Sequence, residues 1–209
     1  MPVVSGVQIL TANAFPLVCL RMSTAALSPK RKVWSDEELE ALPKDGHKYE
    51  LLDAELIRCP IHAGHGVTSA RLAALVGNFV WRRRLGAMFG STTGIRLSNE
   101  LVLSPDLAFA SHATLKRILV APDKFLYGVP DLVVEVLSPS DRIVQINRKL
   151  EHYFEHGTQL AWLVNWRKAQ VHIYTADSIE ALTGPNDVLT GGKVLPGFKC
   201  KLSRIFCPT

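Results

Sequence analysis

The sequence predicts an α/β (α+β) domain in which helices flank a mixed central β-sheet, and three observations support this fold class. Residues 132–137, LVVEVL, are aliphatic except for one position, which is typical of a strand buried on both faces. Residues 64–85 and 141–156 repeat apolar side chains every three or four positions, as amphipathic helices do. Paired short apolar runs at 47–59 and 160–175 indicate β-hairpins.

Composition limits the class of protein. The chain has 209 residues, enough for one domain with a substantial core, and its hydrophobic content of 47% excludes a disordered chain. The net charge of +5 is compatible with a polyanionic partner. The four cysteines stand far apart in the sequence, which favours neither a disulfide framework nor a cysteine metal site and leads us to expect a cytoplasmic protein. They are Cys19, Cys59, Cys200 and Cys207.

The N-terminal segment carries few structural signals. Residues 1–20 contain no charged side chain, whereas a signal peptide begins with positive residues. No run reaches the roughly 18 apolar residues of a membrane-spanning helix. We expect residues 1–30 to be a poorly ordered tail, with Met22 as an alternative start, and residues 31–209 to form a single domain.

Local signals place the first elements. Ser35 and Glu38 fit a capping box that opens a short helix ending near Leu42. A hairpin turn is expected at Asp53-Ala54, although glycine would suit such a turn better. The helix at 64–85 closes with three arginines, which are favourable at a helix C-terminus, and Gly86 is its expected cap.

The second half of the chain is interpreted in the same way. A strand is expected after Pro105 and a short helix over 113–119. Ser138 or Ser140 is expected to cap the helix that runs to His156. That helix should bury the apolar positions Ile143, Ile146, Leu150 and Tyr153 or Phe154. Residues 178–209 are interpreted as a looser return that ends in a short turn over 202–206.

The one polar position of the central strand is Glu135. A carboxylate in a buried strand costs several kcal/mol unless it is paired, hydrogen-bonded or bound to a metal. A structural ion pair with Arg or Lys is one explanation. The other is a functional site, because Asp106 also enters an apolar strand, Glu50 begins another, and Lys149 lies on the following helix. Carboxylates from adjacent strands can hold Mg²⁺, which activates water and neutralises charge on a phosphate.

Several motifs together carry a resemblance to a known family. In chain order they are KYELLDAEL, HGVTSARLAAL, SPDLAFA, PDLVVEVLSPSDR, KLEHYFEHG, LAWLVNWRKAQVHIY and LPGF. With these motifs the sequence resembles the Uma-two-type family of endonuclease-like domains, a branch of the restriction-endonuclease-like PD-(D/E)xK superfamily. The resemblance covers roughly residues 33–206 and implies a restriction-endonuclease-like core.

The resemblance assigns roles to individual residues. It makes Asp106 and Glu135 metal ligands and Glu50 an upstream acid that helps to bind the metal, directly or through water. The superfamily lysine stands two residues after the second acid, where this chain has Leu137. Its role is therefore assigned to Lys149 on the next helix, with three neighbours of matched segments as alternatives: Lys48, Lys168 and Arg148. Asp131 is expected to be a strand-entry residue, and a site role for His65 competes with a structural one at its helix start.

The implied activity is hydrolysis of DNA phosphodiester bonds by a water molecule activated by Mg²⁺ or Mn²⁺. Arg82, Arg96 and Arg142 are candidate contacts to phosphate, and a homodimer is expected. The alternative is a catalytically silent nucleic-acid-binding or regulatory module with the same fold, which the missing lysine at Leu137 favours and the retained acids oppose. Motifs of small-molecule hydrolases, such as GxSxG, are absent from the sequence.

Overall fold

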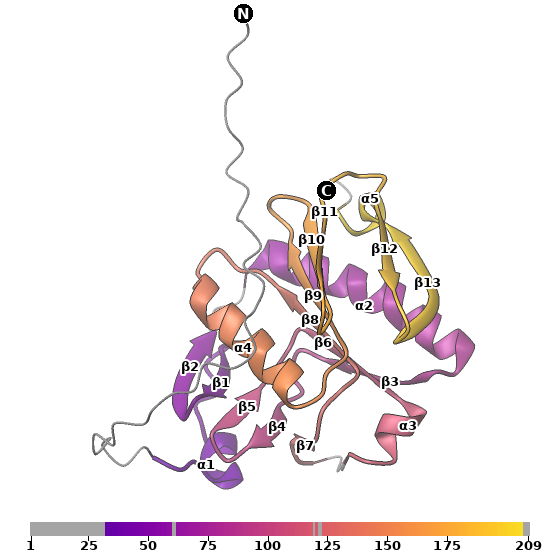
Figure 1. The fold of residues 1–209 in the computed structure, drawn as a ribbon. Helices are drawn as coiled ribbons and strands as arrows, with labels where there is room; N and C mark the ends of the chain where they lie inside the picture. The colour runs from indigo at the N-terminus through magenta and orange to yellow at the C-terminus, as the bar shows by residue number, and fades with distance from the viewer. Residues whose placement is uncertain (1–31, 60–61, 119, 121–122, 207–209) are drawn as a thin grey trace, which may run out of the picture. The chain divides into compact units, whose positions relative to one another are not determined.

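The computed structural model describes residues 32–59, 62–118, 120 and 123–206 (Figure 1). The predicted tail at residues 1–30 lies outside the described residues. The helices are α1 (Asp36–Glu40), α2 (Ala63–Arg83), α3 (His112–Leu115), α4 (Ile143–Glu155) and α5 (Leu202–Ile205). The strands are β1 (Lys48–Leu52), β2 (Glu55–Cys59), β3 (Gly86–Gly90), β4 (Ile95–Ser98), β5 (Leu101–Leu103), β6 (Leu107–Ser111), β7 (Leu126–Tyr127), β8 (Leu132–Val136), β9 (Leu160–Asn165), β10 (Gln170–Tyr174), β11 (Ile179–Leu182), β12 (Val188–Gly191) and β13 (Leu195–Lys201).

A six-stranded mixed sheet forms the centre, in the order β11-β10-β9-β8-β6-β3. Only the β8–β9 pair is parallel among these neighbours, and α4 makes the crossover that a parallel pair requires. The predicted hairpin at 160–175 is the antiparallel β9–β10 pair. The mixed sheet flanked by helices confirms the predicted fold class.

Strand β8 is buried on both faces, as its sequence predicts. Side chains alternate across a strand, so Leu132, Val134 and Val136 point to one face and Val133 and Glu135 to the other. The first three pack in a large apolar core with α2 and with β12, β13 and α5. Val133 packs instead with α4 and with strands of the second sheet. Figure 1 shows α2 and α4 on opposite sides of the central strands.

The second sheet has the order β2-β1-β5-β4-β7, and its β1–β2 hairpin confirms the first predicted one. The turn residues Asp53 and Ala54 have φ angles of 53° and 63°, which defines the left-handed pair of a type I′ turn. Neither residue is glycine. The amide of Ala54 donates to the carbonyl of Glu100 at 2.9 Å, which helps to hold the turn against the neighbouring β4–β5 connection.

The helix termini confirm one prediction and correct another. Ser35 and Glu38 form the predicted capping box of α1. Gly86 does not cap α2, because Arg84 takes the left-handed C-cap conformation, with φ 52°. Gly86 instead begins β3 with φ 156°, and a Cβ atom there would lie 2.0 Å from the carbonyl oxygen of Ala110. Close approach of two strands, and not helix termination, therefore requires this glycine.

Helix α4 begins later than its sequence predicts. Neither Ser138 nor Ser140 caps it; the N-cap is Arg142, whose side chain makes no capping hydrogen bond. The preceding turn closes on itself, because the Ser138 amide donates to Asp141 Oδ2 at 2.6 Å. The predicted buried face is correct at its later positions but wrong for Ile143, which is 59% exposed in the first turn.

The C-terminal region is more regular than expected. Residues 178–206 are not a loose return, because they contain β11, the β12–β13 pair and α5. The short turn predicted over 202–206 is α5. The helix expected over 113–119 is the shorter α3. Among the described residues, no helix is long and apolar enough to cross a membrane.

Candidate active site

The fold brings the four predicted site residues together from four elements. Glu50 lies on β1, Asp106 directly before β6, Glu135 on β8 and Lys149 on α4, and all four side chains are buried. Leu107 pairs with Val134 across β6 and β8, and continuing this register places Asp106 opposite Glu135 on one sheet face. Asp106, Glu135 and Lys149 line a cavity of about 760 Å³.

Lys149 joins two of the carboxylates. Its Nζ atom lies 2.8 Å from Glu135 Oε1 and 3.0 Å from Glu50 Oε2. Burial lowers the pKa of Lys149, but the two carboxylates raise it, and the net shift is upward. The ammonium group therefore stays protonated and neutralises charge between two acids that would otherwise repel each other.

Asp106 is held from two sides. Its Oδ2 atom accepts hydrogen bonds from the Val136 amide at 2.7 Å and from His65 Nε2 at 3.0 Å. Its Oδ1 atom is buried without a hydrogen-bond partner, and Lys48 Nζ lies 3.7 Å away. Burial raises the pKa of Asp106, but the His65 hydrogen bond and the Lys48 charge hold it below its usual value. Asp106 is thus an ionised carboxylate with one oxygen free to accept a ligand.

Glu50 has both oxygens engaged. Oε1 accepts the Ser104 amide at 2.8 Å, and Oε2 faces Lys149 and accepts a weak hydrogen bond from Cys59 Sγ at 3.5 Å. Burial raises the pKa of Glu50, but Lys149 and Lys48 bring it below its usual value. Burial and the Glu50 charge raise the pKa of Cys59 to about 12, so this thiol stays protonated and unreactive.

Glu135 differs from the other two acids. Its Oε1 accepts a hydrogen bond from Tyr153 Oη at 3.0 Å in addition to the Lys149 contact. Burial raises its pKa to about 7; Lys149 opposes this shift, and the charges of Glu50 and Asp106 add to it. Glu135 can therefore gain or lose a proton near neutral pH, which suits proton transfer.

Three further residues contact the site; the sequence interpretation gave Lys48 as an alternative lysine, left a site role for His65 open and assigned none to Tyr153. Lys48 Nζ donates to the Ser104 carbonyl at 2.5 Å beside Asp106, His65 holds Asp106, and Tyr153 holds Glu135. Lys48 and Glu50 stand two positions apart on β1 and therefore share a face. That alternation was the available signal for Lys48. No sequence signal paired His65 with Asp106.

The other candidates lie elsewhere. Arg148 contacts Asp53 at 2.8 Å and Glu151 at 3.2 Å, and Lys168 lies in the β9–β10 turn. Asp131 accepts hydrogen bonds at the start of β8 from the Ser111 amide, Thr114 and Gln159. Arg96 pairs with Asp36 of α1. Arg82 and Arg142 are exposed, at the end of α2 and the start of α4.

The donor atoms of the cavity fit a hard divalent cation. Mg²⁺ is commonly held by one or two carboxylates, with water molecules and substrate phosphate completing its shell. Asp106 and Glu135 supply two such carboxylates on one sheet face, and Asp106 Oδ1, which has no hydrogen-bond partner and lies 3.7 Å from Lys48 Nζ, is a candidate ligand atom. Within the described residues, no three His, Cys, Asp or Glu side chains surround one metal position. The site therefore fits a partly hydrated Mg²⁺ or Mn²⁺ better than a closed, fully protein-ligated centre.

Comparison with solved structures defines the class of fold. The structure is similar to the crystal structure of a protein described as "a putative nuclease belonging to DUF820" from Anabaena variabilis. The TM-score is 0.69 at 19% sequence identity, and the match covers 81% of this chain and 96% of that one. The chain accordingly has a restriction-endonuclease-like fold.

The family follows from the sequence itself. Residues 36–203 match the model of the Uma2 family, which is described as "Putative restriction endonuclease". This match spans most of the chain, and the chain belongs to the Uma2 family. A comparison with curated proteins finds no match.

Proposed function

We propose that this protein is an endonuclease that hydrolyses DNA phosphodiester bonds with the help of Mg²⁺ or Mn²⁺. The observation that carries the proposal is the buried cluster of Asp106, Glu135, Glu50 and Lys149, three of which line one cavity, with Asp106 Oδ1 lacking a hydrogen-bond partner. Three acids, two lysines and a histidine converge beside open space, and such a buried cluster of titratable groups at a cavity supports a site that binds a cation and a phosphate.

Each residue has a distinct task in this proposal. Asp106 and Glu135 hold the cation, and Glu50 acts through Lys149, because both Glu50 oxygens are already engaged. When bound, the cation lowers the pKa of a water molecule and neutralises charge that develops on the phosphate. The water oxygen attacks phosphorus, the bond to one ester oxygen breaks, and a phosphate monoester and a hydroxyl group result.

Lys149 serves as a fixed positive charge and not as a general base. Its raised pKa keeps it protonated, and its contacts to Glu135 and Glu50 fix its position beside the reacting phosphate. Lys48 is more accessible, with 22% of its side chain exposed, and it can contact a phosphate oxygen directly. The two lysines together stabilise negative charge in the transition state.

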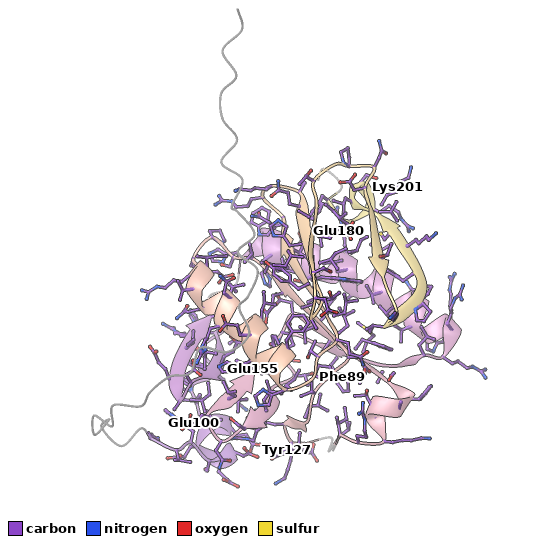
Figure 2. All side chains as sticks on the ribbon, in the orientation of Figure 1. Phe89, Glu100, Tyr127, Glu155, Glu180 and Lys201 are labelled. Carbon is purple, nitrogen blue, oxygen red and sulfur yellow. The ribbon has the colours of Figure 1, made fainter. Side chains whose placement is uncertain are left out.

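Plasmid cleavage tests the proposal. Purified protein is incubated with supercoiled plasmid and Mg²⁺ or Mn²⁺, beside Asp106→Asn and Glu135→Gln. We expect nicking by the wild type and a loss of at least about 1,000-fold in each variant, since each removes a carboxylate that would hold the cation stabilising the transition state. Glu180→Gln is the matched control, because Glu180 is exposed on β11 (Figure 2) and should retain full activity.

Two other outcomes are informative. Nicking that survives both substitutions would identify a contaminant and overturn the assignment. A wild type that binds DNA but cuts none with either metal would establish the alternative, a silent nucleic-acid-binding module. Thermal melting gives a readout that does not depend on cleavage: Mn²⁺ should raise the melting temperature of the wild type but not of Asp106→Asn, since a ligand of the folded state stabilises it.

We further propose that the active form is a homodimer, with one site for each strand of duplex DNA, and that exposed Arg142 contacts phosphate near the cavity, which Asp141 lines. Light scattering coupled to gel filtration tests the dimer, and a monomer mass would refute it. Arg96 can serve the same purpose only after leaving Asp36, its present partner.

A further inference from the structure

The C-terminal end of α2 presents an unusual surface. We define the α2 terminal surface by Trp81, Arg82 and Arg84, all of which are exposed. Trp81 is 78% exposed, whereas Trp162 in the core is completely buried. Indole rings are among the largest apolar groups in proteins, and an exposed one is commonly an anchor for a ligand or partner.

The cations of this surface lack acidic partners. Neither Arg82 nor Arg84 forms an ion pair with any acid in the described part of the chain. The neighbouring α3 adds His112, whose Nε2 donates to the Arg84 carbonyl at 2.8 Å, and the exposed Lys116 and Arg117 follow it. Residues 78–90 and 111–118 contain no Asp or Glu, and the acid that contacts Ser111 and Thr114, Asp131, is buried. The exposed charges of these two segments are therefore all positive.

Helix capping does not account for the whole surface. Cations at a helix C-terminus interact favourably with its dipole, which explains arginines there. Arg83 also has a structural contact, since its guanidinium lies 5.0 Å from the centre of the Phe79 ring. Neither effect accounts for the exposure of the Trp81 ring. An aromatic ring beside unpaired arginines matches the chemistry of a nucleic-acid strand, in which bases stack on aromatic rings and phosphates pair with cations.

This surface lies apart from the candidate active site. His65 in the first turn of α2 contacts Asp106, whereas Arg84 closes the helix at its other end. At 1.5 Å per residue, the two positions are separated by about 29 Å along the helix. A DNA strand rises about 3.4 Å per nucleotide, so this separation corresponds to about eight or nine base pairs.

We infer that the α2 terminal surface is an accessory nucleic-acid contact, which holds the DNA flanking the cleavage site by phosphate pairing and by stacking of an unpaired or terminal base on Trp81. The inference rests on the proposed nuclease function for its biological sense, but the contact itself requires no metal. It predicts that a bound duplex is held at two places, and that the second place adds affinity without taking part in the cleavage chemistry.

Fluorescence anisotropy in EDTA tests this inference separately from cleavage. A fluorescein-labelled 30-base-pair duplex is titrated with wild type, Trp81→Ala and the double variant Arg82→Gln/Arg84→Gln. We expect the double variant to bind about tenfold more weakly, and the slope of log K against log salt to fall by about 1.8, since each lost phosphate contact removes about 0.9. DNA should quench tryptophan fluorescence in the wild type but not in Trp81→Ala.

Lys168→Gln/Lys201→Gln is the matched control, because it removes two exposed charges elsewhere. Lys201 lies near α5, well away from the end of α2 (Figure 2). The affinity of this control variant for the duplex should fall less than threefold. Equal losses in control and test variants would overturn the inference, as would a wild type whose binding depends on metal alone. Circular dichroism confirms that each variant is folded.

Two further measurements distinguish the remaining outcomes. With Mg²⁺ present, the double variant should cut a 30-base-pair duplex more slowly at limiting concentration, while an eight-base-pair duplex, too short to reach both places, should be cut at the wild-type rate. Absence of cleavage with retained metal-free binding would refute the proposed function and leave this contact intact. A change from dimer to monomer in Trp81→Ala, measured by light scattering, would instead assign the surface to self-association and overturn the inference.

Discussion

The two faces of strand β8 are both buried but carry very different side chains. Toward α2, Leu132, Val134 and Val136 pack in a core without charge. Toward α4, Glu135 lies among ionised groups that are almost completely buried. Apolar burial stabilises the fold by about 25 cal/mol per Å², whereas buried ion pairs contribute little or are unfavourable. One face therefore stabilises the domain so that the other can hold reactive charges.

Removing the cation of the charged face should have the largest effect. Lys149→Met leaves Glu50 and Glu135 buried without their shared partner, and we expect the free energy of unfolding at pH 8 to fall by about 3–5 kcal/mol. Urea denaturation measures this loss. Lys168→Met, in the exposed β9–β10 turn, should leave stability within about 0.5 kcal/mol of the wild type. A similar stability for both variants would show that the Lys149 pairs contribute nothing.

The pH dependence of stability should be strongest on the charged face. Burial raises the pKa of Glu135 to about 7 in the folded state, from 4.5. Its favourable contribution is then complete below pH 4.5 and is lost as pH rises through 7, with a total on the order of 3 kcal/mol. Between pH 5 and 8 in EDTA, the wild type should therefore lose more stability than Glu135→Gln. The exposed control Glu180→Gln should follow the wild type, and parallel curves for wild type and Glu135→Gln would contradict the raised pKa.

A deletion on the apolar face should have the smallest effect and no pH dependence. Val134→Ala removes two buried methyl groups, and we expect a loss of about 2 kcal/mol at both pH 5 and pH 8. The same urea titrations measure it. Metal-induced stabilisation should be unchanged, because Val134 points away from the cavity; a weaker Mn²⁺ effect would show that the two faces are coupled.

The sequence predicted those parts of the fold that depend on local pattern. A continuous apolar run identified β8, helical periodicity identified α2 and α4, and paired apolar runs identified two hairpins. Three acids in apolar strands led to one buried cluster beside the cavity. Errors arose where a competing local contact decided the outcome. Asp141 accepts a hydrogen bond from the Ser138 amide, and α4 begins only after this turn. Arg84 takes the left-handed C-cap conformation of α2, whereas Gly86 lies against Ala110 in β3.

Long-range pairing was the part of the site that the sequence could not supply. The contact between His65 and Asp106 joins a helix start to a strand start, and no periodicity links such positions. Lys48 was named only as an alternative to Lys149, although its alternation with Glu50 on β1 places both side chains on one face of the strand. The hydrogen bond from Lys48 to the Ser104 carbonyl could not have been predicted, because it depends on how β1 approaches the β5–β6 connection.

The origin of the site residues has a consequence for folding. The Lys149 bridge joins β1, in the first half of the chain, to β8 and α4 in the second half, and β8 pairs in parallel with β9 only after α4 has crossed over. Such non-local closures are slow steps in folding. A stopped-flow experiment with Mn²⁺ present should therefore find that the affinity for the ion develops in the last kinetic phase, later than the signal of the local hairpins. The appearance of cation affinity would then report when the native topology is complete.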